Sequence, residues 1–140
     1  MSNTLKTSGS CLCGEVTVHA QSASLDVGAC HCSMCRKWTG GPLLAIDCNT
    51  NVSFSGEDNI STYASSDWAE RGFCAKCGSH LYYKLKLNGQ YIVPAGLFDN
   101  ETAFNFDHQI FIEEKPTYYD FANNTKNMTG EEVFAQFSGE

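Results

Sequence analysis

Seven of the eight cysteines in this 140-residue chain fall into three tight clusters, and this feature constrains the fold more than any other. The clusters are Cys11-Leu-Cys13, Cys30-His-Cys32-Ser-Met-Cys35 and Cys74-Ala-Lys-Cys77. A closed structural zinc site takes four thiolate or imidazole ligands, whereas a catalytic site takes three protein ligands and keeps one position for water or substrate. The clustered cysteines therefore divide most naturally into one site of four and one of three, with two zinc ions per chain.

A disulfide framework is the first alternative, because the number of cysteines is even. Residues 1–10 are polar and lack the apolar stretch of a secretory signal, so we expect the reducing cytoplasm. The C-x-C and C-x-x-C spacings also bring two sulfurs to one point, as metal binding requires, and do not join distant segments. A redox C-x-x-C motif normally opens a helix after a strand in a βαβ unit, and the sequence shows no such alternation. Metal ligation is therefore favoured.

Length and composition predict a single domain over residues 1–140, with a core at about residues 8–120 and a C-terminal extension at about 121–140. The hydrophobic fraction is 42% and there is no long apolar run, so we expect a soluble globular protein without a membrane span. The net charge of -7 becomes more negative still when thiolates hold the zinc ions. An acidic surface repels phosphate backbones, so nucleic acid is excluded as the default partner.

Hydrophobic periodicity predicts a mainly β fold. Short alternating segments are separated by Gly, Asn, Asp and Ser, and the predicted strands cover 15–20, 43–47, 52–55, 60–64, 69–73, 80–87, 90–94 and 108–112. Asn88-Gly89 predicts a hairpin with a type I′ turn. A short helical turn is expected at 32–38, a polar loop at 123–127, and a terminal helix after the capping-box spacing of Thr129 and Glu132.

The residues that follow the clusters indicate which cysteines belong together. Cys13 and Cys77 are each followed by glycine, Gly14 and Gly78, and glycine lets a metal knuckle adopt positive φ and aim N–H groups at the thiolates. We therefore predict a closed structural zinc site that joins two distant hairpins and uses Cys11, Cys13, Cys74 and Cys77.

Cys30, Cys32 and Cys35 then form a three-thiolate set followed directly by Arg36. Three thiolates on Zn²⁺ carry one net negative charge, so a guanidinium is favourable beside them and could hold an anionic substrate group. This pattern predicts an open zinc site. The alternative is a site closed by a fourth ligand, for which the candidates are Cys48, His31 and His80.

Each of those candidates also has a structural interpretation. Cys48 ends an apolar run, which favours a buried core thiol. His31 lies between two ligands and is expected to point away from the metal, whereas His80 is either a surface strand residue or an acid or base in a pocket. His19 and His108 have no informative neighbours, and no residue stands out as a general base.

The two arginines of the chain both adjoin cysteine clusters. Arg36 follows Cys35 directly, and Arg71 precedes Cys74 by three residues. They could recruit a small anionic substrate or merely balance the thiolate charge, and both interpretations remain open at this stage.

The three clusters together resemble the glutathione-dependent formaldehyde-activating enzymes and their centromere-protein-V relatives. The matching segments are Gly9-Ser-Cys-Leu-Cys-Gly-Glu-Val16, Cys30-His-Cys-Ser-Met-Cys-Arg-Lys37 and Arg71-Gly-Phe-Cys-Ala-Lys-Cys-Gly78. His108-Gln-Ile110 and Lys115-Pro-Thr-Tyr-Tyr-Asp120 are similar to the closing region of that family, so the likeness covers roughly residues 8 to 120.

The resemblance implies a single-domain zinc-bound β-tent, in which antiparallel sheets are pinned by cysteine clusters, and a short C-terminal helix. It implies a carbon–sulfur lyase that reversibly joins formaldehyde to glutathione or a similar small thiol. By the same resemblance the catalytic zinc would lie on Cys30, Cys32 and Cys35, and the structural zinc on the other four cysteines. Our own hypothesis, from their charge and position, is that Arg36 and Arg71 bind substrate.

Two other functions fit the same residues. The chain could be a non-catalytic zinc-stapled binding module, or a redox or metal sensor that uses the three-cysteine cluster. It lacks the basic extension that a chromatin-associated relative would need to hold nucleic acid. The sequence does not define the true thiol and aldehyde or the oligomeric state.

Overall fold

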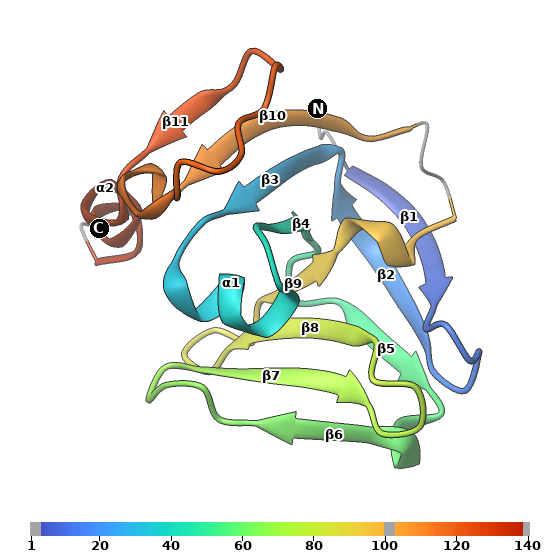
Figure 1. The fold of residues 1–140 in the computed structure, drawn as a ribbon. Helices are drawn as coiled ribbons and strands as arrows, with labels where there is room; N and C mark the ends of the chain where they lie inside the picture. The colour runs from blue at the N-terminus through green and yellow to red at the C-terminus, as the bar shows by residue number, and fades with distance from the viewer. Residues whose placement is uncertain (1–3, 100–102, 139–140) are drawn as a thin grey trace.

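The computed structural model describes residues 4–99 and 103–138, which form two β-sheets and two short α-helices (Figure 1). The smaller sheet has the order β1-β2-β5 and consists of β1 (Thr4–Ser10), β2 (Thr17–Ser24) and β5 (Val52–Ser55). The larger sheet has the order β11-β10-β3-β4-β9-β8-β7-β6. Its strands are β3 (Asp26–Cys30), β4 (Leu43–Asp47), β6 (Ile60–Tyr63), β7 (Ala69–Cys74), β8 (His80–Leu85), β9 (Tyr91–Pro94), β10 (Asn105–Ile110) and β11 (Lys126–Met128). The helices are α1 (Ser33–Thr39) and α2 (Gly130–Ser138).

The strand pairing is mostly antiparallel, as predicted, with one exception at the edge of the larger sheet. There β10 runs parallel both to β3 and to β11. A parallel pair needs a long crossover connection, and here the chain between β3 and β10 contains most of the remaining fold. The parallel edge brings residues close to the C-terminus beside the Cys30 segment (Figure 1).

The predicted mainly β character is confirmed, and β4 and β5 have the predicted bounds. Three strands were not predicted: β1, β3 and β11. The sequence of β1 is largely polar, and β3 has buried residues at three consecutive positions, so neither strand shows clear alternation. The predicted loop at 123–127 ends inside β11, whose short pairing with β10 has no local sequence signal.

The hairpin between β8 and β9 is confirmed, but its predicted type I′ turn is wrong. That turn needs positive φ at both central residues, whereas Gly89 has φ 75° and Asn88 is not among the described residues with positive φ. The loop is longer: the Gly89 amide donates to the Leu85 carbonyl at 2.9 Å, and the Gln90 amide donates to Asn88 Oδ1 at 2.9 Å. The Asn88 side chain thus stabilises the turn, and of the two central residues only Gly89 has a left-handed backbone.

The main hydrophobic core lies between the two sheets. Alternate residues of β2, among them Val18 and Ala20, face Ile46, Leu81 and Val93 of the larger sheet, and all five are 0% exposed. On the opposite face of the larger sheet a smaller apolar cluster contains Leu43, Ala45 and Cys35. The alternation along β4 therefore places one set of residues in the core and the other beside the three-cysteine segment.

The C-terminal helix begins with the predicted capping box. The Glu132 amide donates to the Thr129 hydroxyl at 3.1 Å, and the Glu132 carboxylate accepts from the Thr129 amide at 2.8 Å. In the described part of the chain, no helix is both long and apolar enough to span a membrane.

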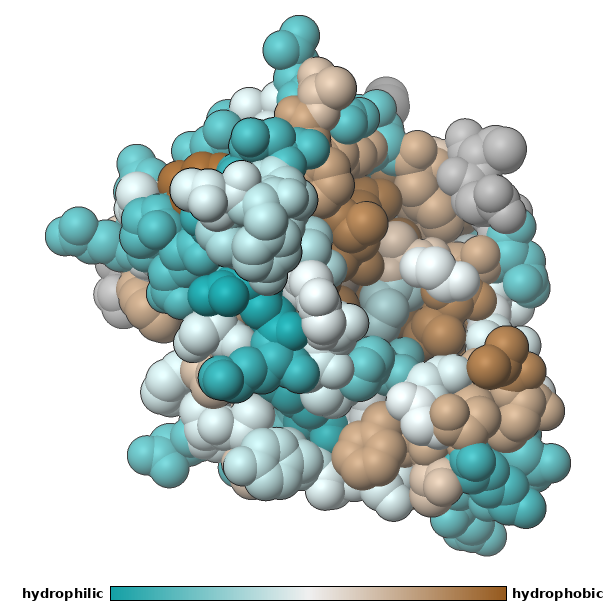
Figure 2. Space-filling model, viewed as in Figure 1, coloured by the Kyte–Doolittle hydropathy of each residue, from teal (hydrophilic) through white to brown (hydrophobic). Residues whose placement is uncertain are grey.

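An apolar hollow lies beside the main core, on the core-facing side of β3 and β4. Figure 2 shows apolar residues gathered over the region where Figure 1 places β3, β4 and the turn after β9. A cavity of about 390 Å³ there is lined by residues that include Val27, Leu44, Phe104 and Phe106. It lies apart from the cysteine clusters, because no cysteine lines it.

Candidate functional site

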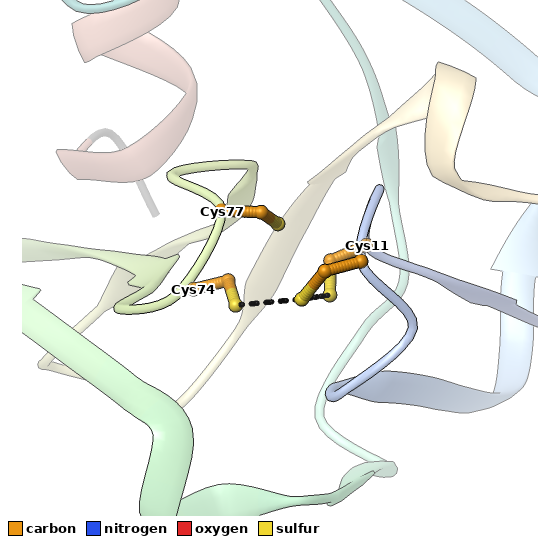
Figure 3. A group of neighbouring side chains, drawn as sticks. Cys11, Cys74 and Cys77 are labelled. Carbon is orange, nitrogen blue, oxygen red and sulfur yellow. Dashed lines mark hydrogen bonds between the residues drawn. The ribbon is translucent and has the colours of Figure 1, made fainter.

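The first candidate metal centre brings together four cysteines from two segments that are far apart in the sequence. Cys11 and Cys13 follow β1, Cys74 ends β7, and Cys77 lies in the turn before β8. The four sulfurs lie within 4.8 Å of one another, and Figure 3 shows the two knuckles facing each other. The Cys13 Sγ lies 3.7 Å from both Cys11 Sγ and Cys74 Sγ. A tetrahedron with sulfurs 2.3 Å from a central zinc has edges of about 3.8 Å, so the donor set fits tetrahedral zinc.

The glycines after these cysteines shape both knuckles. Gly14 has φ 82° and Gly78 has φ 79°, which confirms the positive φ predicted for both. Their amides donate to the carbonyls of Cys11 at 3.0 Å and Cys74 at 2.8 Å, and so close the two turns. The N–H groups that reach sulfur come from the next residues, as in the bond from the Val16 amide to Cys11 Sγ at 3.3 Å.

The thiol of Cys77 is stabilised in its charged form by its surroundings. Hydrogen bonds from the Ser79 side chain and backbone lower the pKa of Cys77 to about 5. The Ser79 hydroxyl lies 3.3 Å from Cys77 Sγ. Since metal ligands are thiolates, a neighbour that favours the charged form also favours metal binding.

The second candidate centre contains Cys30, Cys32 and Cys35. Cys30 ends β3, Cys32 caps α1 and Cys35 lies in the first turn of that helix. Their sulfurs lie within 4.8 Å of one another, and across residues 4–99 and 103–138 no other His, Cys, Asp or Glu side chain joins them. Three thiolates leave one position of a tetrahedral zinc open, so this donor set fits the catalytic type of zinc site.

The start of α1 arranges these three sulfurs. Cys32 Sγ accepts a hydrogen bond from the Cys35 amide at 3.4 Å, which is the helix N-cap interaction. Hydrogen bonds from Cys30 and then Cys35 lower the pKa of Cys32 to about 2. The same contacts raise the pKa of Cys30.

The candidate fourth ligands lie elsewhere. Cys48 is 0% exposed in the main core, where burial raises the pKa of its thiol to about 12, so the core position predicted for it is confirmed. His80 packs its ring against Trp38 with centroids 4.2 Å apart, and it is half-buried, not on the surface. Its Nδ1 is buried without a hydrogen-bond partner, and burial lowers the pKa of the imidazole.

His31 points away from the sulfurs and supports their loop, as predicted. The residue is 0% exposed. Its Nδ1 lies 2.8 Å from the Tyr119 hydroxyl and its Nε2 lies 2.8 Å from Gln109 Oε1. Both ring nitrogens are therefore engaged by residues near the C-terminus, and neither is free to bind metal.

The two arginines have different positions. Arg36 donates from Nε to the His31 carbonyl at 2.8 Å, which fixes the loop between two cysteines. Arg71 is 3% exposed and donates from Nη1 to Cys35 Sγ at 3.5 Å. Its guanidinium lies 4.9 Å from the Trp38 ring centroid and 4.8 Å from that of Tyr83. The two aromatic rings hold a buried positive charge against the three sulfurs.

The three sulfurs open onto a cavity of about 680 Å³ on the face of the larger sheet opposite the main core. Cys30, Cys32, Cys35 and Arg71 line one end. The walls are largely apolar and include Leu43, Ala45, Ile92, Phe111 and Val133. Asp26 and Asp47 line the other end. Asp26 is four residues from Cys30 on β3, or about 13 Å, and Asp47 ends the neighbouring strand β4. The cavity is therefore long enough for a small substrate and is charged differently at its two ends.

Sequence reasoning missed several residues that complete this site. Gln109 and Tyr119 hold His31, and Tyr83 packs on Arg71, but each is distant in sequence from the residue it contacts. Asp107 and His108 also line the cavity, although the sequence around His108 was uninformative. Of these five residues, His108, Gln109 and Tyr119 lie in the two segments that are similar to the closing region of the family, although neither segment indicated a role for them.

The chain is similar in sequence and fold to several known proteins. The family described as glutathione-dependent formaldehyde-activating enzyme matches residues 6–114. An uncharacterised lyase of Schizosaccharomyces pombe is 40% identical over 127 residues, which cover 89% of this chain and 92% of that protein. A Halomonas elongata protein named for the same formaldehyde-activating activity is 36% identical over 83 residues, or 53% of each chain. A crystal structure of a Rhodobacter sphaeroides protein has a similar fold, with a TM-score of 0.57 and 23% identity over 66% of this chain and 88% of that one.

Proposed function

The chain belongs to the family of glutathione-dependent formaldehyde-activating enzymes, and from this premise we propose that it is a zinc-dependent carbon–sulfur lyase. It reversibly joins formaldehyde to glutathione or a similar small thiol and forms an S-hydroxymethyl adduct. The observation that carries the proposal is the three-sulfur cluster, which has no fourth protein ligand among the described residues and opens onto the 680 Å³ cavity. A zinc site closed by four protein ligands would only stabilise the fold, as in a binding module. A site with three protein ligands beside a cavity can also bind and activate a substrate.

The two cysteine groups have different roles in this proposal. Cys11, Cys13, Cys74 and Cys77 hold a structural zinc that cross-links two hairpins. Cys30, Cys32 and Cys35 hold the catalytic zinc. When bound there, zinc supplies a Lewis acid that polarises a carbonyl or lowers the pKa of a thiol. The apolar walls of the cavity exclude water from the reacting groups, which strengthens electrostatic interactions between them.

Arg71 is the residue that we assign to the substrate carboxylate. It lines the cavity beside the sulfurs, and its charge is held in place by Trp38 and Tyr83. Three thiolates and one zinc ion carry one net negative charge, so Arg71 also brings the end of the cavity close to neutrality and lets an anionic substrate approach. Arg36 was expected to share this role, but it does not line the cavity, and its Nε bonds the His31 carbonyl. We assign Arg36 to positioning the cysteine loop.

The test is zinc-loaded protein with formaldehyde and a panel of thiols, followed by exchange NMR of the thiol and its adduct. We expect the protein to accelerate the exchange with glutathione or another carboxylate-bearing thiol, and Cys32→Ser to abolish the acceleration while the fold remains. His19→Gln is the matched control, because His19 bonds Ser55 at 2.9 Å in the smaller sheet, away from the cavity. No acceleration with any thiol would refute the lyase and favour the binding module.

A further inference from the structure

The edge strand β10 carries a β-bulge where it passes the cavity. Its register against β3 shifts between Phe106 and His108. In a regular strand, adjacent side chains point to opposite faces of the sheet, so only one of two neighbours could reach the cavity. A bulge adds a residue and redirects a side chain, and both Asp107 and His108 line the cavity.

The bulge joins these two side chains into a dyad. His108 Nδ1 lies 2.5 Å from Asp107 Oδ1. A carboxylate at Nδ1 keeps the proton of neutral imidazole on that nitrogen and leaves Nε2 as an acceptor. Nε2 has no hydrogen-bond partner in the part of the chain that the structure describes. The dyad thus presents one unpaired basic nitrogen.

Glycine at position 28 makes room for this ring. A Cβ added to Gly28 would lie 2.1 Å from His108 Nε2, so no larger residue fits there unless the ring moves. Gly28 and Cys30 are two residues apart on β3 and both line the cavity. Residues two apart on a strand are separated by about 7 Å, so the Nε2 edge lies within one small substrate of the sulfur cluster.

We propose that His108 is the catalytic residue that carries the proton in the lyase reaction, with Asp107 as its positioning residue. This inference rests on the proposed function. In the forward direction Nε2 accepts the thiol proton, and a sulfur electron pair forms the bond to the formaldehyde carbon. The carbonyl π pair moves to oxygen, which then takes the proton back from Nε2. No other reactant is needed, and the reverse path cleaves the carbon–sulfur bond.

The main test compares His108→Gln with wild type by exchange NMR on the zinc-loaded protein. We expect kcat to fall by about 10²-fold or more, the range typical of a lost general base, with KM changed by less than roughly threefold. Asp107→Asn should reduce kcat by less. In His108→Ala the space over Gly28 is vacated, so added imidazole should restore part of the rate. A residue with only a structural role would not respond to imidazole.

Gly28→Ala is a second variant that keeps the imidazole but displaces it. It should lower kcat in the wild-type background and have little further effect in the His108→Gln background. A binding readout completes the test: the His108 imidazole resonances should shift when S-methylglutathione is added, and those of His19 should not.

The outcomes separate the two proposals. Active wild type with an equally active His108→Gln, or His108 resonances that do not respond to S-methylglutathione, would overturn the role of His108 and leave the lyase standing. Wild type that accelerates no thiol reaction would overturn the lyase and this inference with it.

Discussion

Removal of one side of the four-cysteine group should destabilise the protein strongly. The Cys74→Ser/Cys77→Ser double variant leaves Cys11 and Cys13 without their partners, so a zinc cross-link between the two hairpins can no longer form. Ser replaces the sulfurs with little change in volume. The main consequence is therefore the loss of the cross-link and not of packing.

The magnitude follows from the length of chain that the cross-link closes. Cys13 and Cys74 are 61 residues apart in sequence, and closing a loop of that length removes about 4 kcal/mol of conformational entropy from the unfolded chain. The three-cysteine cluster closes a loop of only about 5 residues, for which the same relation gives about 2 kcal/mol. For a domain of this size, 4 kcal/mol corresponds to a fall in Tm of roughly 12–20 °C.

The assay is urea and thermal unfolding of zinc-loaded protein, with and without chelator. Cys30→Ser/Cys32→Ser should lose about half as much stability as Cys74→Ser/Cys77→Ser, because its loop is shorter. Cys48→Ser controls for a hydroxyl at a buried cysteine position, since Cys48 is 0% exposed and belongs to neither group. Chelator should destabilise wild type by the sum of both cross-links, and the Cys74→Ser/Cys77→Ser variant only by the roughly 2 kcal/mol assigned to its remaining three-cysteine site. If chelator did not affect wild-type stability, the cross-link would be refuted.

Three further predictions concern the cavity, the metals and the core. Arg71→Lys should raise KM for glutathione by more than KM for cysteamine, which has no carboxylate, because Lys cannot bond a carboxylate bidentately. Equal changes in the two KM values, measured by exchange NMR, would contradict the assignment of Arg71 to the substrate carboxylate. Native mass spectrometry should show two zinc ions per chain, and a chelator series should remove the one at the three-sulfur site first, since only three protein ligands hold it. Leu81→Ala should lower the free energy of unfolding by about 2–5 kcal/mol in urea, because Leu81 is 0% exposed in the main core, and a loss below 1 kcal/mol would refute that placement.

The parts of the fold that could be predicted are those with local signals. β4 and β5 were recognised from short β-rich runs bounded by turn residues, and the α2 capping box from the spacing of Thr129 and Glu132. The glycines after Cys13 and Cys77 indicated two similar knuckles, because positive φ is a local backbone requirement. Each of these features depends on a few consecutive residues.

The parts that could not be predicted depend on pairing between distant segments. β3 has no alternating pattern, since it is covered on both faces: by the core on one side and by the cavity residues and His108 on the other. β11 is a strand only because β10 lies beside it. His108 lies near the sulfur cluster because β10 pairs with β3 in a parallel register that contains a bulge. The residues around His108 show no pattern from which this register or the bulge could be predicted.

The same parallel strand explains why two neighbouring residues serve the site from different sides. Gln109 bonds His31 at 2.8 Å and so holds the loop between Cys30 and Cys32, whereas His108 lies over Gly28 and lines the cavity. Side chains alternate along a strand, so one strand can fix the sulfur cluster from behind and place a base in front of it. The pairing of β10 with β3 thereby sets both positions at once. A shift of this register by one residue would exchange the two faces, and the cysteine loop would lose its support together with the proposed base.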